Sequence, residues 1–211
     1  MKSQKNPVGS YGYGEGSPKN VVDAYRDKLV KEICEDLDTR RSNTIVICMN
    51  LTGDFNKASV IRAANAFLAK EVILVGKRRL DRRGAVGTHH YEHILHREDT
   101  SFIDDLIADG YTVFPVDNIK EYQPKRIDRY SLPEKCAFVF GEELLGLSDE
   151  VIKQCNAPMI YIPQYGSVRS INVAQAAAVV LYEYTRQHPD AQSASPSTLL
   201  ADDLAKKDNN L

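Results

Sequence analysis

Three stretches of the chain place polar side chains or glycines directly after an apolar, strand-like run. They are DFNKASVIRAA (residues 54–64), FVFGEELLGLS (138–148) and IPQYGSVRSINVAQAAA (162–178). Each stretch predicts a junction where a strand meets a helix, and ligands of open α/β sheets bind at such strand ends. Because three of these junctions occur in one unit, we expect a single ligand site built from several turns.

The elements that must hold these turns alternate along the chain. Apolar runs typical of buried parallel strands occur at TIVICMNL (44–51), EVILVG (71–76), YTVFPV (111–116), CAFVFG (136–141) and MIYIP (159–163). Helical patterns cover residues 20–36, 56–70, 102–109, 147–155 and 170–187, with Ser148 as the N-cap of the fourth. This alternation predicts an α/β fold, a mostly parallel sheet with helices on both faces.

The last of these helices is apolar or Ala at nearly every position from residue 173 to 182 (VAQAAAVVLY). A helix that is apolar all round is buried all round. We expect one side to pack against the sheet and the Ala-rich side to pack against a second copy, which predicts a homodimer. A core helix of a monomer remains the alternative.

Size and charge exclude several classes of protein. With 211 residues, of which 43% are hydrophobic, the chain is long enough for one α/β domain with short extensions. Its net charge of -2 does not mark a strongly basic protein, although a local basic face can still bind RNA. Residues 1–20 lack the apolar region of a secretory signal, and no run approaches the roughly 18 apolar residues of a membrane helix. We therefore expect no membrane contact and a cytoplasmic location.

Cysteines and histidines offer neither a disulfide pair nor a metal cluster. The cysteines form no close pair and no CxxC, so we interpret them as reduced thiols: Cys34, Cys48, Cys136 and Cys155. In HHYEHILH (89–96), His89 and His93 lie four positions apart, but the segment also alternates like a strand around Ile94 and Leu95. With no second group of ligands at a suitable spacing, we expect no metal site.

Taken together, the three stretches resemble the SpoU branch of the SPOUT RNA methyltransferases. That family has an Asn and an Arg six positions apart, then a motif resembling FGxExxGLS, then one resembling IPMxGxxxSLNVxxAxxxxxYE. The counterparts here are Asn56 with Arg62, FGEELLGLS, and IPQYGSVRSINVAQAAAVVLYE, in the same order within residues 42–187. Mild departures include Ala58 for Gly, Ala63 for Thr, Glu142 before the motif Glu, and Ile171 for Leu.

The resemblance implies a fold, a cofactor and a reaction. It implies a deep trefoil knot in the C-terminal half of the sheet, which the general rule against threaded connections would not predict. It implies that S-adenosylmethionine is bound, that a ribose 2′-hydroxyl of tRNA or rRNA is methylated, and that the protein is a homodimer. Residues 42–188 would form the methyltransferase domain, 19–41 a helical extension, and 1–18 and 189–211 flexible ends.

The resemblance also assigns catalytic roles. Arg62 is the residue that it names as catalytic, although a solvated helix Arg is the plain alternative. Because a guanidinium stays protonated, we expect Arg62 to grip the phosphate next to the target ribose and orient the hydroxyl. The catalytic set is completed by Asn56, Glu143, Ser170 and Asn172. Helix capping is the alternative for Asn56 and Asn172, and both roles can hold at once; Glu143 would support the site.

Cofactor binding is expected from the second and third stretches. Gly141 and Gly166 lack a Cβ and would let the backbone approach the cofactor. The resemblance adds backbone atoms of Ile162 and Ile171, although Ile162 reads equally as an ordinary core residue of a strand.

A basic run follows the second predicted strand. KRRLDRRG (77–84) holds five cations in eight residues, which fits a loop that grips phosphates and also fits an ordinary solvated charge run. We expect RNA contacts from Lys77, Arg78, Arg79, Arg82 and Arg83, with Arg40 and Arg41 extending the patch.

Two other functions compete with this interpretation. A Rossmann nucleotide-binding enzyme would carry G-x-G-x-x-G after its first strand, and MNLTGDFNKAS does not. A non-catalytic RNA-binding module of the same fold remains open, and binding of S-adenosylmethionine would separate it from the enzyme. About 40 residues precede the core, too few for a separate RNA-recognition domain, which favours tRNA over a large rRNA target.

Overall fold

A computed structural model describes residues 20–49, 54–76, 80, 82–142 and 145–189 of the chain. In these residues a seven-stranded sheet has the order β3-β2-β1-β6-β4-β7-β5, and its paired strands are parallel. The strands are β1 (Thr44–Met49), β2 (Glu71–Val75), β3 (Ile94–Arg97), β4 (Thr112–Val116), β5 (Lys125–Arg126), β6 (Cys136–Phe140) and β7 (Ile160–Tyr161). The predicted parallel sheet is confirmed.

Helices precede, separate and follow these strands along the chain. They are α1 (Val30–Asp38), α2 (Asp54–Ala66), α3 (Phe102–Ala108), α4 (Asp149–Gln154) and α5 (Val173–Gln187). The 3-10 turns are η1 (Asp23–Tyr25), η2 (Arg82–Ala85), η3 (Thr88–His90), η4 (Lys120–Tyr122) and η5 (Ile127–Arg129). Within the described residues, no helix has both the length and the apolar character to cross a bilayer. All four cysteines carry free thiols.

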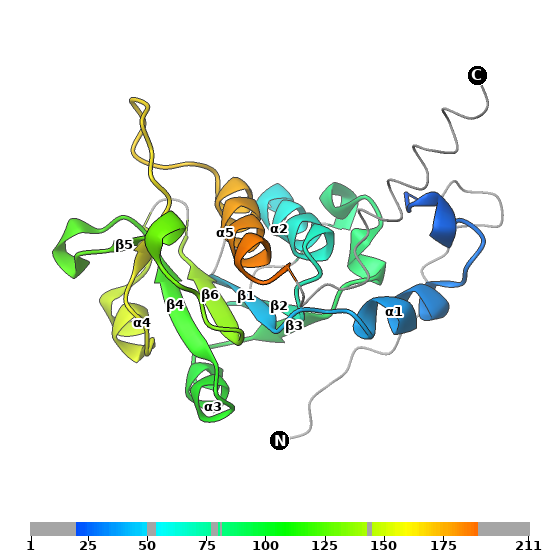
Figure 1. Ribbon diagram of the computed structural model, residues 1–211, viewed down its shortest axis with the longest axis horizontal. Coiled ribbons are helices and arrows are strands. Elements are labelled where there is room, and N and C mark those ends of the chain that lie inside the picture. Colours follow the sequence, from blue (N-terminus) through cyan, green and yellow to red (C-terminus); the bar gives the residue numbers. More distant parts are fainter. Residues whose placement is uncertain (1–19, 50–53, 77–79, 81, 143–144, 190–211) are drawn as a thin grey trace.

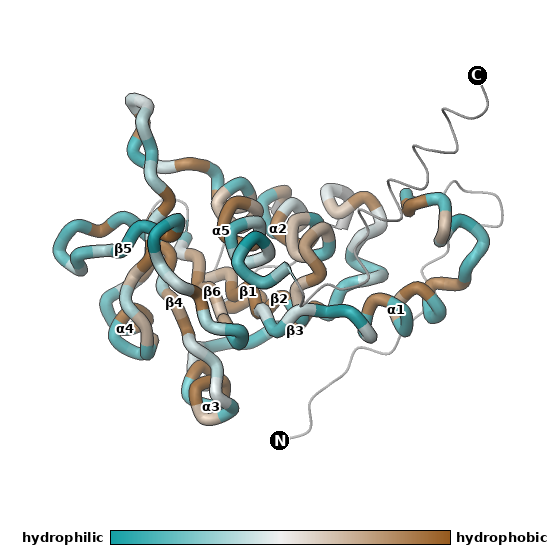
Figure 2. The backbone as a smooth tube through the Cα atoms, viewed as in Figure 1, coloured by the Kyte–Doolittle hydropathy of each residue, from teal (hydrophilic) through white to brown (hydrophobic). Residues whose placement is uncertain are grey.

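Alternate residues of each central strand point to opposite faces of the sheet and pack in two separate cores. Val46 and Cys48 of β1 pack in the core that contains the inner sides of α2 and α5. Ile45 and Ile47 pack in the core that contains α3 and α4. Figure 1 shows the two pairs of helices on opposite faces, and Figure 2 shows the hydrophobic strands between them. The prediction of helices on both faces is thereby confirmed.

Polar caps decide where the later helices begin. Ser148 accepts from the backbone N–H of Val151, so the predicted N-cap of α4 is confirmed. The last helix begins at Val173 and not at residue 170, because Asn172 keeps an extended backbone and caps the first turn through its side chain.

The N-terminal extension is not the single helix predicted over residues 20–36. It is divided into η1 and α1, and Leu29 between them is extended and 68% exposed. The side chain of Glu32 accepts from the backbone N–H of Leu29 at 2.6 Å, which starts α1 at Val30. A prediction from apolar spacing alone therefore ran one helix through residue 29, because it did not take into account the cap that begins a new helix there.

The expectation that Arg40 and Arg41 contact RNA stays a prediction, and the surroundings of both side chains disfavour it. The side chain of Arg41 is only 5% exposed and pairs with Glu92 at 2.8 Å and with Asp38 at 2.7 Å. Arg40 is 10% exposed and pairs with Asp36 at 2.8 Å. A carboxylate as buried as that of Glu92 needs a partner of opposite charge, so Arg41 serves the interior of the fold.

The parallel sheet brings the predicted ligand turns to one end of the sheet, where the strands have their carboxyl ends. Strands β1 and β6 are neighbours at the centre, and the chain continues from them in opposite directions across the sheet. Such a switch point opens a crevice at the carboxyl ends of the strands. The described segments that follow β4, β6 and β7 leave from these carboxyl ends. The C-terminal knot stays a prediction.

Candidate active site

A hydrogen bond joins two of the predicted site residues, one at the start of α2 and one at the start of α5. Nδ2 of Asn172 donates to Oδ1 of Asn56 at 2.8 Å, although 116 residues separate them. Oδ1 of Asn172 accepts from the backbone N–H of Ala174 at 2.9 Å and so caps α5. Asn172 therefore caps a helix and also ties it to the first turns of α2. We call this contact the Asn56–Asn172 bridge.

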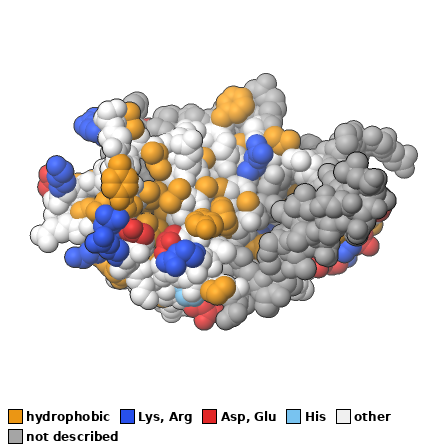
Figure 3. Space-filling model, turned by 45° about the horizontal axis from the view of Figure 1, so that its top comes forward, with side chains coloured by type: hydrophobic (Ala, Val, Ile, Leu, Met, Phe, Trp, Pro, Cys, Tyr) orange, Lys and Arg blue, Asp and Glu red, His pale blue; other side chains and the backbone are white. Residues whose placement is uncertain are grey.

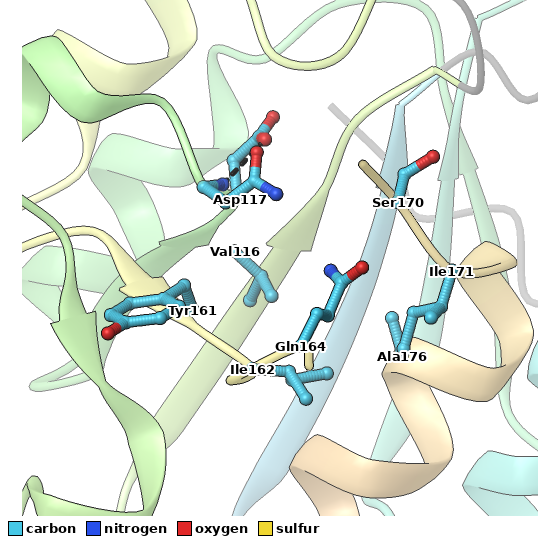
Figure 4. A pocket seen from close by; sticks show the side chains of 9 residues that line it. Val116, Asp117, Tyr161, Ile162, Gln164, Ser170, Ile171 and Ala176 are labelled. Carbon is cyan, nitrogen blue, oxygen red and sulfur yellow. Dashed lines mark hydrogen bonds between the residues drawn. The ribbon is translucent and has the colours of Figure 1, made fainter. Parts of the chain in front are cut away.

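A cavity of about 110 Å³ lies beside the start of α5. Three predicted residues line it: Ile162, Ser170 and Ile171. Six residues that were not predicted also line it: Val116, Asp117, Asn118, Tyr161, Gln164 and Ala176 (Figure 4). Asp117 and Asn118 directly follow YTVFPV, so the rule that ligands bind at strand ends would have found them had it been applied to this strand.

Gly141 is required by a tight turn at the end of β6. A Cβ at this position would lie 2.3 Å from the carbonyl carbon of Gly146. Glu142 and Gly146 exchange backbone hydrogen bonds of 3.1 and 2.8 Å, which hold the turn closed. Gly146 has φ +67°, and the Oδ2 atom of Asp117 accepts from the next N–H, that of Leu147, at 3.4 Å. The turn after β6 is thus fastened to the cavity wall.

The segment from β7 to α5 leaves the body of the protein before it returns, as Figure 1 shows. Nδ2 of Asn118 donates to the carbonyl of Arg169 at 2.8 Å and anchors the returning part. Gly166 lies in the outer part, with no atom within 4 Å of where its Cβ would be. Tyr165 beside it is 86% exposed. Packing within the chain does not explain Gly166, and its contact with a cofactor stays a prediction.

Arg62 lies on α2 with its side chain in solvent. It forms no hydrogen bond or ion pair with any described residue. Six residues along a helix correspond to about 9 Å of rise and about 120° of rotation, so Arg62 is beyond the Asn56–Asn172 bridge and faces another direction. The structure leaves this guanidinium available to a ligand.

Several predicted residues lie outside the described part of the chain. These are Glu143, Lys77, Arg78 and Arg79, and the side chains of Arg82 and Arg83. The backbone of η2, which carries Arg82 and Arg83, packs on α2. A Cβ on Gly84 would lie 2.9 Å from the Cβ of Ala58, so a glycine is needed where η2 crosses the helix. Within the described residues, no group of three or more His, Cys, Asp or Glu could hold a metal ion.

Comparison with known proteins places this site in a family. The model of the SpoU rRNA Methylase family matches residues 43–182. A tRNA (guanosine(18)-2′-O)-methyltransferase of Aquifex aeolicus is 25% identical over 186 residues, which cover 85% of this chain and 86% of the relative. A putative tRNA (cytidine(34)-2′-O)-methyltransferase of Mycoplasma genitalium is 26% identical over 69% of this chain and 90% of its own. A mouse tRNA (guanosine(18)-2′-O)-methyltransferase is 34% identical, but over 41% of this chain and 5% of its own length.

Solved structures share the fold. The crystal structure of the Aquifex aeolicus TrmH/SpoU tRNA modifying enzyme superposes with a TM-score of 0.67 at 24% identity, over 76% of this chain and 83% of that one. The SpoU methyltransferase AviRb of Streptomyces viridochromogenes, solved in complex with AdoMet, has a TM-score of 0.63 at 23% identity. That match covers 72% of this chain and 64% of AviRb.

Proposed function

Because the chain belongs to the SpoU rRNA Methylase family, we propose that it is an S-adenosylmethionine-dependent methyltransferase acting on a ribose 2′-hydroxyl of tRNA. The observation that carries the proposal is the Asn56–Asn172 bridge, which joins the first and third motifs of the family beside a cavity. The relatives of Aquifex aeolicus and Mycoplasma genitalium named above are tRNA 2′-O-methyltransferases, which supports tRNA as the substrate class. A 23S rRNA 2′-O-methyltransferase of Bacillus subtilis, 26% identical over 82% of this chain, makes rRNA the alternative.

The cavity residues fit the cofactor. Ile162 and Ile171 supply apolar walls, and the buried Oε1 atom of Gln164 has no hydrogen-bond partner among the described residues. At Gly141 the backbone of the neighbouring turn comes too close for any side chain. When bound, S-adenosylmethionine supplies a methyl group on a sulfonium, so the protein has little covalent chemistry to perform.

The remaining task of the protein is to place the ribose hydroxyl and to help remove its proton. We assign the phosphate next to the target ribose to Arg62, whose exposed guanidinium can bind a phosphate through two N–H groups. Held in this way, the ribose hydroxyl would be oriented toward the methyl group of the bound cofactor, and the phosphate or a water would take the proton that the hydroxyl loses. The Asn56–Asn172 bridge keeps the helix of Arg62 in register with the cavity. Ser170, exposed at the cavity, can orient the ribose, and Glu143 supports the site.

RNA binding outside the site is assigned to the basic segment of Lys77, Arg78, Arg79, Arg82 and Arg83. This segment leads into η2, which packs on the helix of Arg62, so a phosphate backbone bound there would run toward the site. Replacing Arg82 and Arg83 together by Ala should weaken tRNA binding. The slope of log binding constant against log salt concentration should become shallower by about 1 for each phosphate that these side chains neutralise. An unchanged salt dependence would leave the segment as a solvated charge run.

A homodimer is the proposed assembly. Ala174 and Ala177 of α5 are buried within the chain and Ala178 is half-buried, so the expectation that the Ala-rich side faces a second copy stays a prediction. The outer side carries Val179 and Tyr182, which are 41% and 59% exposed, and Phe55 at the start of α2 is 65% exposed. Figure 3 shows hydrophobic side chains gathered on the face that α2 and α5 form. Sedimentation of wild-type protein and of Tyr182→Glu should give a dimer and a weakened dimer; a wild-type monomer would contradict the proposal. We also propose a cytoplasmic location, as the sequence analysis expected.

Methyl transfer from radiolabelled S-adenosylmethionine onto tRNA that lacks this modification tests the assignment of Arg62. Arg62→Ala should abolish transfer while the affinity for S-adenosylhomocysteine stays that of the wild type. Arg26→Ala, which removes another exposed arginine far from the sheet edge, is the matched control and should transfer normally. Near-normal turnover by Arg62→Ala would refute its role, and wild-type protein that binds no cofactor would favour a non-catalytic RNA-binding module.

A further inference from the structure

We propose that the side-chain amide of Gln164 recognises the adenine base of the cofactor and makes the site selective for its 6-amino group. The inference rests on the proposed function, because it names the part of S-adenosylmethionine that the cavity takes. It concerns a residue that the motif resemblance does not explain, since the family motif quoted above carries Met at this position.

The first observation is an unmet hydrogen-bonding group. Oε1 of Gln164 is buried and has no partner among the described residues. Buried acceptors in folded proteins are nearly always paired, because burial removes the water that would otherwise donate to them. Figure 4 shows the amide of Gln164 amid the residues that line the cavity, pointing away from Ile162. A donor is therefore expected from whatever fills the cavity.

The second observation is the chemistry of the walls around this amide. Val116, Ile162, Ile171 and Ala176 give the cavity apolar walls that suit a flat ring. Asp117, Asn118 and Ser170 line the same cavity with polar groups that suit the ribose hydroxyls or the amino-acid end of the cofactor. At about 110 Å³ the space beside Gln164 takes part of the cofactor and not the whole of it. A base inserted edge-on would bring its polar edge to the amide.

An amide side chain and adenine are complementary at that edge. Gln can accept from the 6-amino group while its own NH₂ donates to a neighbouring ring nitrogen, the pairing by which Gln and Asn read adenine in nucleic acids. Such a contact satisfies the buried Oε1 atom that the structure leaves without a partner. Gln164 would thus be a specificity-determining residue, and methyl transfer itself would not need it.

The test is calorimetric binding of two ligands, S-adenosylhomocysteine and its analogue with hydrogen in place of the 6-amino group. The deamino analogue is a cleaner probe than the 6-oxo analogue, because an amide rotated by 180° could donate to an oxo group. Wild-type protein should bind S-adenosylhomocysteine about tenfold more tightly than the analogue, the effect of one buried hydrogen bond. Gln164→Met, similar in length and without polar groups, should bind the two ligands about equally.

Thermal unfolding of Gln164→Met without ligand controls for its fold. Equal affinities for the two ligands in the wild type, or an unchanged preference in Gln164→Met, would overturn the inference and leave the methyltransferase proposal standing. A wild-type protein that binds neither ligand would overturn the proposed function together with the inference.

Discussion

Replacing Asn172 should separate its role as a helix cap from its role in the Asn56–Asn172 bridge. Asn172→Ala removes both the acceptor for the N–H of Ala174 and the donor to Asn56. Loss of an N-cap costs about 1 kcal/mol, and an exposed hydrogen bond between side chains adds about 0.5 kcal/mol. The sum of about 1.5 kcal/mol corresponds to a fall of roughly 3–6 °C in Tm for a domain of this size.

Asn172→Ser is the matched control, because Ser caps helices about as well as Asn but is too short to reach Asn56. Its unfolding free energy should stay within about 0.5 kcal/mol of the wild type. If the bridge aligns the site, both variants should transfer methyl groups slowly, although only Asn172→Ala is less stable. Urea denaturation and single-turnover methyl transfer measure the two effects separately. Wild-type transfer by Asn172→Ser would show that Asn172 acts as a cap alone and would refute the argument.

Three further predictions concern packing and buried charge. Gly141→Ala should lower both Tm and cofactor affinity, because its Cβ would lie 2.3 Å from the backbone of Gly146; calorimetry showing normal affinity would contradict this. Arg41→Ala should cost roughly 3–5 kcal/mol at pH 8 by leaving Glu92 unpaired, while tRNA affinity per folded molecule stays constant; a loss of affinity would restore Arg41 to the RNA surface. Burial raises the pKa of Glu92 from 4.5 to about 7, so the folded state holds a proton that the unfolded chain releases earlier. This stabilisation is present below pH 4.5 and is lost as the pH rises through about 7, a slope that Glu92→Gln should remove in urea titrations.

The strands could be predicted because each is an apolar run bounded by polar residues, and β1, β2, β4 and β6 lie within the predicted ranges. The local pattern of apolar residues is therefore enough to predict the strands at the centre of the sheet. Charge pattern was less informative: Arg41 looked like part of a basic surface, yet its partner Glu92 lies 51 residues further along the chain. No local signal shows that a cation will be buried against a carboxylate so distant in sequence.

Site residues inside the three motifs could be predicted from the sequence, and those outside the motifs were missed. Asn56 and Asn172 belong to two of the three stretches expected to share one site, and they form a hydrogen bond that periodicity alone could not have predicted. Asp117 and Asn118 were missed because their strand end carried no glycine-rich turn to draw attention. Gln164 was inside a quoted motif, but the burial of its Oε1 atom without a partner among the described residues can be seen only in the folded chain.

The most direct test of the central claim is mass spectrometry of nucleosides from tRNA incubated with the protein and S-adenosylmethionine carrying a deuterated methyl group. The proposed function predicts one labelled 2′-O-methylnucleoside, at one position of the tRNA, with the wild type and none with Arg62→Ala. A label on a base, or no transfer to any tRNA by protein that binds the cofactor, would contradict it.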